Sequence, residues 1–98
     1  MEIEKQSLSY TMVIQGVLDY TTLHIFNEAI VKLDSEKVVL DFSQLEFIDS
    51  TGIGAIVELA YLGKQRGFTV HLQGLNEETE ALFETVGLYK ILKAVQGE

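Results

Sequence analysis

The stretch that decides the fold runs Leu40-Asp-Phe-Ser-Gln-Leu-Glu-Phe-Ile-Asp-Ser-Thr-Gly-Ile-Gly-Ala-Ile56. It begins within a mostly continuous apolar run from Val38 to Phe42, which predicts a central strand covered on both faces. After a short polar turn, Asp49-Ser-Thr-Gly52 leads into a strongly apolar helix that begins at Ser50 or Thr51. Such a junction directs backbone N–H groups outward, which suits an anion or a phosphorylated side chain. We call this junction, Asp49-Ser-Thr-Gly52, the tip, and we interpret the rest of the chain as the scaffold that presents it.

Upstream of this stretch, the pattern predicts a strand and then a helix. Residues 8–17 alternate apolar and polar side chains, as in a half-buried strand or hairpin that ends at Gly16. The helix that follows has Asp19 as its N-cap, with Thr21 as the rival cap, and ends near residues 34–36. Spacings of three and four predict its buried face, which comprises Leu23, Phe26, Ile30 and Leu33.

Downstream, the pattern predicts two further helices around another strand. The helix after Asp49 ends at Gly67, and its predicted core-facing stripe comprises Ile53, Ile56, Val57, Ala60 and Tyr61. A strand over residues 68–72 and a turn at Gly74 follow. A helix capped by Asn76 then runs through Val86 and ends at Gly87, and it buries Leu82, Phe83 and Val86. Residues 88–95 are predicted as a last strand or a docked coil.

Strands that alternate with helices predict an α/β fold. We expect a single domain over residues 1–98, with its core over about 8–95. The expected architecture is a mixed central sheet of four to five strands packed with about three to four helices.

Charge and composition exclude several classes of function. Fifteen acidic residues against seven basic ones give a net charge of −8, which argues against nucleic acid and anionic lipid as partners. A basic protein partner or simple solubility fits this charge equally well. The chain lacks cysteine, its first residues do not resemble a signal peptide, and its most apolar run is too short to span a bilayer. We expect a cytoplasmic protein that is not bound to a membrane.

Ser50 is the sharpest candidate for chemistry, and two interpretations are open. As a helix N-cap its hydroxyl would accept a backbone N–H, which alone explains a serine here. As an exposed hydroxyl it could accept a phosphate, which the helix end favours and the neighbouring Asp49 opposes. Thr51 offers a second hydroxyl, and spacing alone does not rank the two.

The residues after Ser50 also permit two interpretations. Gly52 and Gly54 allow another backbone to approach the helix closely, whereas a nucleotide loop is disfavoured because no lysine follows them. Ala55, Leu59 and Leu62 lie opposite the predicted core stripe. They either pack against a neighbouring helix or form a contact patch for a partner protein beside Ser50.

Metal binding and catalysis have weak support. His24 and His71 stand alone, without a second ligand at metal spacing. Asp41 and Asp49 form an acid pair only if the strand brings them together, and no base accompanies a nucleophile. A small hydrolase or transferase that uses Ser50 with Asp49 therefore remains the third-ranked hypothesis. No cofactor and no metal site are expected.

Three segments of the sequence carry a family resemblance, namely Gly16-Val-Leu-Asp19, Val39-Leu-Asp-Phe-Ser-Gln-Leu-Glu-Phe-Ile-Asp-Ser-Thr-Gly-Ile-Gly54 and Leu82-Phe-Glu-Thr-Val-Gly-Leu-Tyr-Lys-Ile91. They closely resemble the STAS family and, more narrowly, the bacterial anti-sigma factor antagonists. The resemblance implies a mixed sheet with packed helices, and a partner switch that regulates transcription. The unmodified antagonist binds an anti-sigma factor that is itself a serine kinase, phosphorylation from ATP ends that binding, and a metal-dependent serine phosphatase restores it.

The resemblance also assigns roles to residues of this chain. It implies that Ser50 is the phosphorylated serine, that Asp49, Thr51, Gly52 and Gly54 form its recognition loop, and that Asp19 lies near the same tip. With Ala55 and Leu59 added as partner contacts, this is the predicted site. One departure concerns the C-terminus, because family members usually continue into a further helix, which we expect to be short or absent here. The runner-up function is a STAS binding subunit of a signalling or transporter assembly whose serine is never phosphorylated.

Overall fold

The computed structural model describes residues 1–6, 9–32 and 34–97. Its elements, in chain order, are β1 (Glu2–Gln6), β2 (Ser9–Val13), β3 (Gly16–Leu18), α1 (Leu23–Val31), β4 (Lys37–Asp41), β5 (Leu45–Ile48), α2 (Ser50–Arg66), β6 (Thr69–Gln73), α3 (Glu77–Thr85) and α4 (Leu88–Gln96). The α/β class predicted from the sequence is confirmed. Strand β1 was not predicted.

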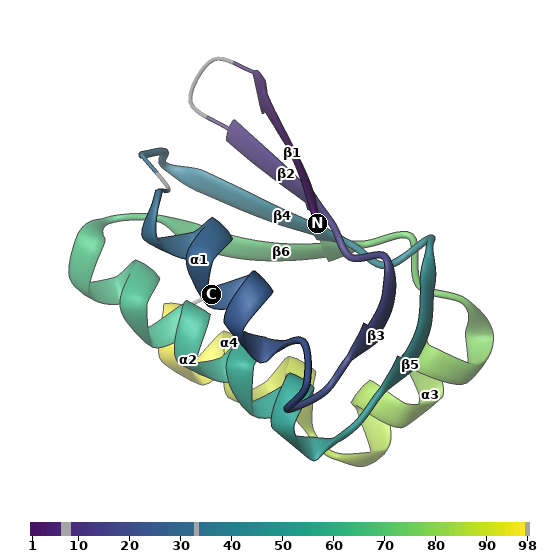
Figure 1. Ribbon diagram of the computed structural model, residues 1–98. Helices are drawn as coiled ribbons and strands as arrows, with labels where there is room; N and C mark the ends of the chain where they lie inside the picture. The colour runs from purple at the N-terminus through teal and green to yellow at the C-terminus, as the bar shows by residue number, and fades with distance from the viewer. Residues whose placement is uncertain (7–8, 33, 98) are drawn as a thin grey trace.

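The strands form two sheets that serve different purposes. A four-stranded sheet has the order β1-β2-β4-β6, in which β1 and β2 are antiparallel and the other neighbours are parallel. The second sheet consists of β3 and β5, which pair in parallel. Figure 1 shows this small sheet extending away from the large one toward the start of α2. The mixed sheet therefore forms the body of the domain, and the β3–β5 pair carries the tip.

Strand β4 is central and buried on both faces, as predicted, although helices cover only one of these faces. Val38 and Leu40 are fully buried, and Figure 1 shows α1, α2 and α4 together on one side of the sheet. Val39, on the other face, is 8% exposed and lies in register between Thr11 and His71. Its strand neighbours, rather than a second helix layer, therefore account for the continuous apolar run.

Helix α2 begins at Ser50, as predicted, and ends at Gly67, whose φ of 90° is the left-handed conformation of a helix cap. Its buried stripe differs from the predicted one and comprises Gly52, Ala55, Ile56, Leu59, Ala60 and Gly63. Tyr61 is 54% exposed, and Ile53 and Val57 are only half-buried. Ile56 and Ala60 of the predicted stripe are buried, whereas its other members are not. The stripe is shifted because α2 packs against α1, α4 and β6 together, and because its approach to neighbouring segments at Gly52 and Gly63 leaves no room for a side chain.

Residues 88–95 form most of helix α4, so the prediction of a strand or coil is wrong. Leu88, Leu92 and Val95 are buried at helical spacing, and α4 packs against α2. The expectation that a C-terminal helix is short or absent is also corrected, because α4 spans nine residues. At its end, the Gln96 side chain accepts a hydrogen bond from Val70 N (2.5 Å) and donates one to Val70 O (3.2 Å). These bonds attach α4 to the outer edge of β6.

The first helix is shorter than predicted. Helix α1 begins at Leu23 after Thr22, so neither Asp19 nor Thr21 is its N-cap, and it ends at Val31 rather than near residues 34–36. Phe26 and Ile30 are buried as expected, whereas the predictions for Leu8 and Leu33 lie outside the described residues. Gly16 does not end the first strand region but begins β3.

The third helix has the predicted cap. Asn76 Oδ1 accepts a hydrogen bond from Thr79 N at 2.8 Å. Only Phe83 of its predicted face is buried, since Leu82 is 37% and Val86 is 44% exposed. The helix is thus anchored at one point and leaves part of its apolar surface in solvent.

Candidate functional site

The tip of the domain is assembled where β3 and β5 end side by side. Leu18 is in register with Ile48, and Asp49 N donates a hydrogen bond to Leu18 O at 3.4 Å. Asp19 and Asp49 therefore follow neighbouring strand ends at the same edge of the small sheet, next to the start of α2 (Figure 1). The structure thus brings Asp19 to the tip, as the resemblance implied.

Asp49, and not Ser50, is the N-cap of α2. Its Oδ1 accepts hydrogen bonds from Thr51 N (3.0 Å) and Gly52 N (3.2 Å). The cap interpretation of Ser50 is therefore wrong, since Ser50 is the first helical residue and its side chain is exposed. In the described part of the chain its hydroxyl has no hydrogen-bond partner. Thr51 is half-buried, so Ser50 is the more accessible of the two hydroxyls.

The loop after β3 holds Asp19 in a fixed geometry. Asp19 Oδ1 accepts hydrogen bonds from Thr21 Oγ1 (2.6 Å) and Thr21 N (2.8 Å). Asp19 N in turn donates to Thr22 Oγ1 (3.1 Å), and that hydroxyl donates to Val17 O (2.8 Å). The hydrogen bond from the Thr21 hydroxyl, aided by those from the backbone and opposed by desolvation, holds the pKa of the Asp19 carboxyl below its usual value. Asp19 is therefore ionised at neutral pH.

The two glycines of the motif have different environments. A Cβ at Gly52 would lie 2.5 Å from Leu18 O and 2.7 Å from Ile48 Cγ1. Gly52 is therefore needed for the close approach of α2 to the ends of β3 and β5. A Cβ at Gly54 would meet no described heavy atom within 4 Å. Of the two, only Gly54 leaves room for another molecule.

Ala55 and Leu59 belong to the core, being 5% and 2% exposed, and Leu62 is half-buried. The structure thus supports the packing interpretation of these residues and contradicts an exposed patch made of all three. Ala55 nevertheless borders a hollow of about 260 Å³ between α1 and α2, together with Ser50, Thr51 and Gly54. Leu59 borders a neighbouring hollow of about 210 Å³. Any partner contact of Ala55 or Leu59 is thus confined to the walls of these hollows.

Two exposed aromatic residues accompany the tip and were not predicted. Tyr20, next to Asp19, is 76% exposed, and Phe47, on β5, is 54% exposed. Exposed aromatic side chains are typical of protein interfaces. The sequence gives little indication of this role for Phe47, because Phe47 lies in a stretch that was interpreted as a turn leading into α2.

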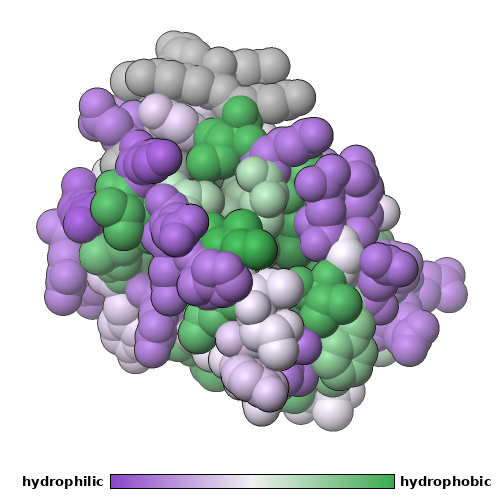
Figure 2. All heavy atoms as spheres, viewed as in Figure 1, coloured by the Kyte–Doolittle hydropathy of each residue, from purple (hydrophilic) through white to green (hydrophobic). Residues whose placement is uncertain are grey.

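The segments that build the tip carry only negative formal charge. Residues 15–31 and 38–63 contain Asp and Glu but neither Lys nor Arg. Figure 2 shows side chains of intermediate hydropathy, in pale colours, at the bottom of the molecule, where Figure 1 places the start of α2. The tip is therefore a small acidic surface with exposed hydroxyls rather than a large apolar patch.

The residues considered for metal binding and catalysis are not brought together. Asp41 Oδ1 accepts a hydrogen bond from Ser43 N (2.9 Å) in the turn before β5, whereas Asp49 follows the other end of that strand. His71 Nε2 shares a hydrogen bond with Thr69 Oγ1 (2.8 Å), and His24 is exposed on α1. In residues 1–6, 9–32 and 34–97, no group of three or more His, Asp or Glu side chains is arranged to hold a metal ion.

None of the helices in the described chain is long and apolar enough to cross a membrane.

Comparisons with known proteins agree with the fold. The chain is 30% identical over 89 residues to the anti-sigma F factor antagonist of Paenibacillus polymyxa, over 87% of this chain and 76% of that protein. Its structure is similar to that of the protein TM1081, with a TM-score of 0.80 and 22% identity over 93% of this chain and 76% of that one.

The same fold is found in proteins of other kinds. A sulfate transporter family protein from Wolinella succinogenes matches with a TM-score of 0.78 and 17% identity, over 89% of this chain and 73% of that one. The chain also matches Mglu, of which it spans only 20%. The STAS domain, as a family, matches residues 1–97. This chain therefore belongs to the STAS domain family.

Proposed function

We propose that this protein is a non-enzymatic anti-sigma factor antagonist whose tip binds an anti-sigma factor that is also a serine kinase. Phosphorylation of Ser50 switches this binding off and so regulates transcription by a sigma factor. The observation that carries the proposal is the free hydroxyl of Ser50, which is exposed at the first position of α2 while Asp49 provides the cap. The similarity to the anti-sigma F factor antagonist of Paenibacillus polymyxa supports the antagonist role. We propose that this protein acts in the cytoplasm.

The chemistry of the switch is a phosphoryl transfer from ATP to Ser50. A bond forms between Ser50 Oγ and the γ-phosphorus, the bond from that phosphorus to the β,γ-bridging oxygen breaks, and the hydroxyl proton passes to a base of the kinase. A metal-dependent serine phosphatase reverses the modification by hydrolysis. This chain contributes the acceptor oxygen and its presentation on a rigid helix start.

The local structure favours a switch that acts on the partner rather than on the fold. Phosphoserine adds about −1.5 to −2 charge, and the helix start favours that charge by about 0.3–1 kcal/mol. The cap is made by Asp49, so phosphorylation of Ser50 breaks no capping bond. Residues 15–31 and 38–63 contain no Lys or Arg that could pair with the phosphate. The added charge therefore increases the negative potential that the partner meets.

The binding test uses a candidate anti-sigma factor serine kinase from the source organism, with ATP. The Ser50→Ala variant should keep the complex and lose phosphorylation, whereas Ser50→Asp should weaken the complex. Thr51→Ala is the matched control and should still be phosphorylated. Phosphorylation that persists in Ser50→Ala and disappears in Thr51→Ala would move the acceptor to Thr51.

A second candidate function is a STAS binding subunit that is never phosphorylated. It is favoured by the similarity to a sulfate transporter family protein and by the match to a small part of Mglu. Purification from the source cells distinguishes the two functions. A complex that survives incubation with ATP and contains no phosphorylated Ser50 supports the binding subunit, and a complex that ATP dissolves supports the antagonist.

A further inference from the structure

A second surface, beside the tip but separate from Ser50, has the features of a docking groove. It is a hollow of about 390 Å³ between β5 and α3. Apolar residues from both elements line it, namely Leu45, Phe47, Ile48, Ala81 and Leu82. Phe47 is 54% and Leu82 is 37% exposed, so a large part of this apolar surface faces solvent.

The walls of the groove are already fixed in the free protein. Phe83 of α3 is fully buried and packs edge-on against Phe42, with ring centroids 5.5 Å apart. The Asn76 cap fixes the start of the same helix through its hydrogen bond to Thr79 N. Because the contact of Phe83 and the Asn76 cap hold α3 in place, the position of Leu82 in the groove does not depend on a bound partner.

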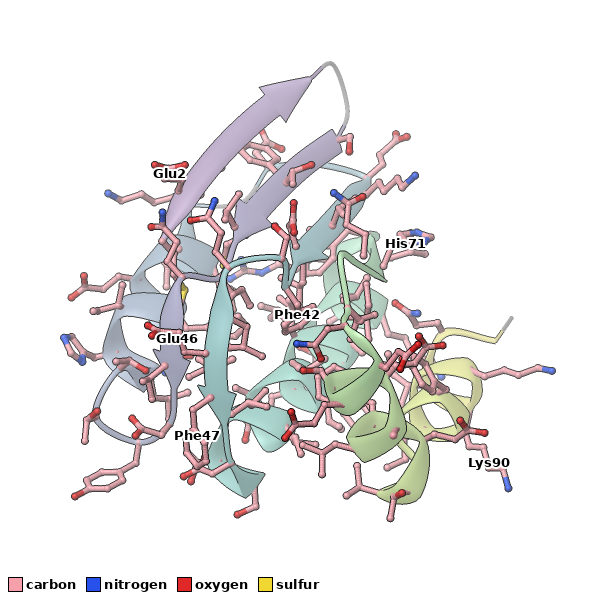
Figure 3. The ribbon with its side chains drawn as sticks, turned by 90° about the vertical axis from the view of Figure 1, so that its right-hand side faces the viewer. Glu2, Phe42, Glu46, Phe47, His71 and Lys90 are labelled. Atoms are coloured by element: carbon pink, nitrogen blue, oxygen red, sulfur yellow. The ribbon has the colours of Figure 1, made fainter. Side chains whose placement is uncertain are left out.

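Carboxylates lie mainly on the α3 side of the groove. Glu78 of α3 lines it, and Glu77 and Glu80 also lie in the first turn of α3. Glu46 of β5 borders the groove as well, but its Oε2 lies 3.4 Å from the position that a Cβ at Gly16 of β3 would take. Among the described lining residues none is Lys or Arg. Figure 3 shows Glu46 and Phe47 along β5, with Lys90 on α4 beyond α3 and directed away from them. An occupant of this groove must therefore combine apolar with positively charged side chains.

The edge of β5 gives such an occupant a backbone to pair with. Strand β5 pairs with β3 on one side, and no other described strand pairs with it. It has four residues, Leu45–Ile48, so an added strand would pair over about the same length. In an added strand, alternate side chains point to opposite sides, so the apolar residues could face the floor of the groove while the basic residues lie on the other side of the bound segment.

We propose that the groove between β5 and α3 binds an extended segment of a partner protein in which apolar residues alternate with Lys or Arg. A second copy of this chain does not fit, because its own β5 and α3 would bring like charges together and the whole chain carries a net charge of −8. Ile48 ends β5 and Asp49 follows it, so the bound segment lies next to the tip. Binding in this groove does not require phosphorylation of Ser50. The groove proposal and the proposed phosphorylation switch can therefore be refuted independently.

The test uses a fluorescein-labelled peptide of alternating lysine and valine, added to the full-length ¹⁵N-labelled protein. Amide shifts should change over residues 45–48 and 78–85. Phe47→Asp should weaken binding by about tenfold or more, because it places a charge on the apolar floor. Tyr61→Asp is the matched control, because Tyr61 is also 54% exposed but lies on α2, and it should bind as the unmodified protein does.

Charge is tested separately from apolar contact. Glu78→Lys should weaken the peptide complex severalfold, whereas Glu36→Lys, an equal charge change outside the groove, should have little effect. The proposal is overturned if the peptide does not bind, if a glutamate–valine peptide binds equally well, or if shifts spread over the whole acidic surface. Self-association that Phe47→Asp abolishes in sedimentation experiments would also overturn it, since the occupant would then be a second copy.

Discussion

Replacing each glycine of the Asp49-Ser-Thr-Gly-Ile-Gly54 segment by alanine should change stability in opposite directions. At Gly52, the new methyl group would lie 2.5 Å from Leu18 O and 2.7 Å from Ile48 Cγ1. Overpacking of this kind costs about 1–3 kcal/mol. We expect a cost at the upper end of this range, because the nearest atom is the Leu18 carbonyl oxygen. This backbone oxygen accepts a hydrogen bond from Asp49 N and cannot move aside as a flexible side chain would.

The higher helix propensity of alanine offsets about 1 kcal/mol of that cost, so the net loss of unfolding free energy for Gly52→Ala is about 2 kcal/mol. At Gly54 no described heavy atom lies within 4 Å of the added carbon. Only the difference in helix propensity remains at this position, so Gly54→Ala should raise the free energy of unfolding by about 1 kcal/mol. The free energies of unfolding of the two variants should therefore differ by about 3 kcal/mol.

Urea and thermal unfolding followed by circular dichroism measure both effects. For a domain of this size each kcal/mol shifts the melting temperature by about 4–8 °C, so Gly52→Ala should melt about 8–16 °C lower. Gly54→Ala should melt several degrees higher. Equal melting temperatures for the two variants, or a loss of stability at Gly54, would refute the view that α2 approaches the small sheet through Gly52 alone.

Three further predictions concern the cap, the acidic loop and the C-terminal helix. Asp49→Ala removes two capping bonds and should lower the unfolding free energy by about 1 kcal/mol, measured in urea, whereas Ser50→Ala should leave it nearly unchanged. The lowered pKa of Asp19 stabilises the fold above the unfolded-state pKa of about 3.9, and this contribution is lost as the pH falls through the folded-state pKa. In Asp19→Asn, the free energy of unfolding should therefore fall less steeply as the pH is lowered below about 4. An unchanged pH dependence would contradict the claim that hydrogen bonds to Asp19 stabilise the fold. Gln96→Ala should speed hydrogen exchange at the Val70 amide, and exchange at its original rate would show that the amide has another partner.

The junction at the centre of the site was predictable because its signals are local. The start of α2 at Ser50 follows from a polar cap before an apolar run, and the Asn76 cap follows from the same logic. The identity of the cap was less certain, since Asp49 and Ser50 are both good N-cap residues. Only the backbone geometry assigns that role to Asp49 and so leaves the Ser50 hydroxyl free.

The errors arose where packing rather than local pattern decides the structure. Helix α2 is apolar on several sides, so its sequence fits more than one stripe. Contacts with α1, α4, β5 and β6 select the one centred on Ala55 and Leu59. The segment from Leu88 to Val95 is short enough to fit a strand, although Leu88, Leu92 and Val95 recur at helical spacing.

The arrangement of the tip depends on strand pairing, which the sequence pattern does not determine. Asp19 and Asp49 are thirty residues apart, and the parallel pairing of Leu18 with Ile48 places them at one edge. The family resemblance predicted this proximity, whereas residue spacing did not. The groove beside β5 had no sequence signal, because it depends on how α3 is oriented by Phe83 against Phe42.

The most direct test of the central claim is tandem mass spectrometry of the protein purified from its source cells, lysed with chelator present so that metal-dependent phosphatases are inactive. We expect a phosphate localised to Ser50 whose occupancy changes with growth condition. A phosphate on Thr51 instead would contradict the assignment of the acceptor. The absence of phosphate under every condition would contradict the switch and leave Ser50 as an ordinary exposed residue of a STAS binding subunit.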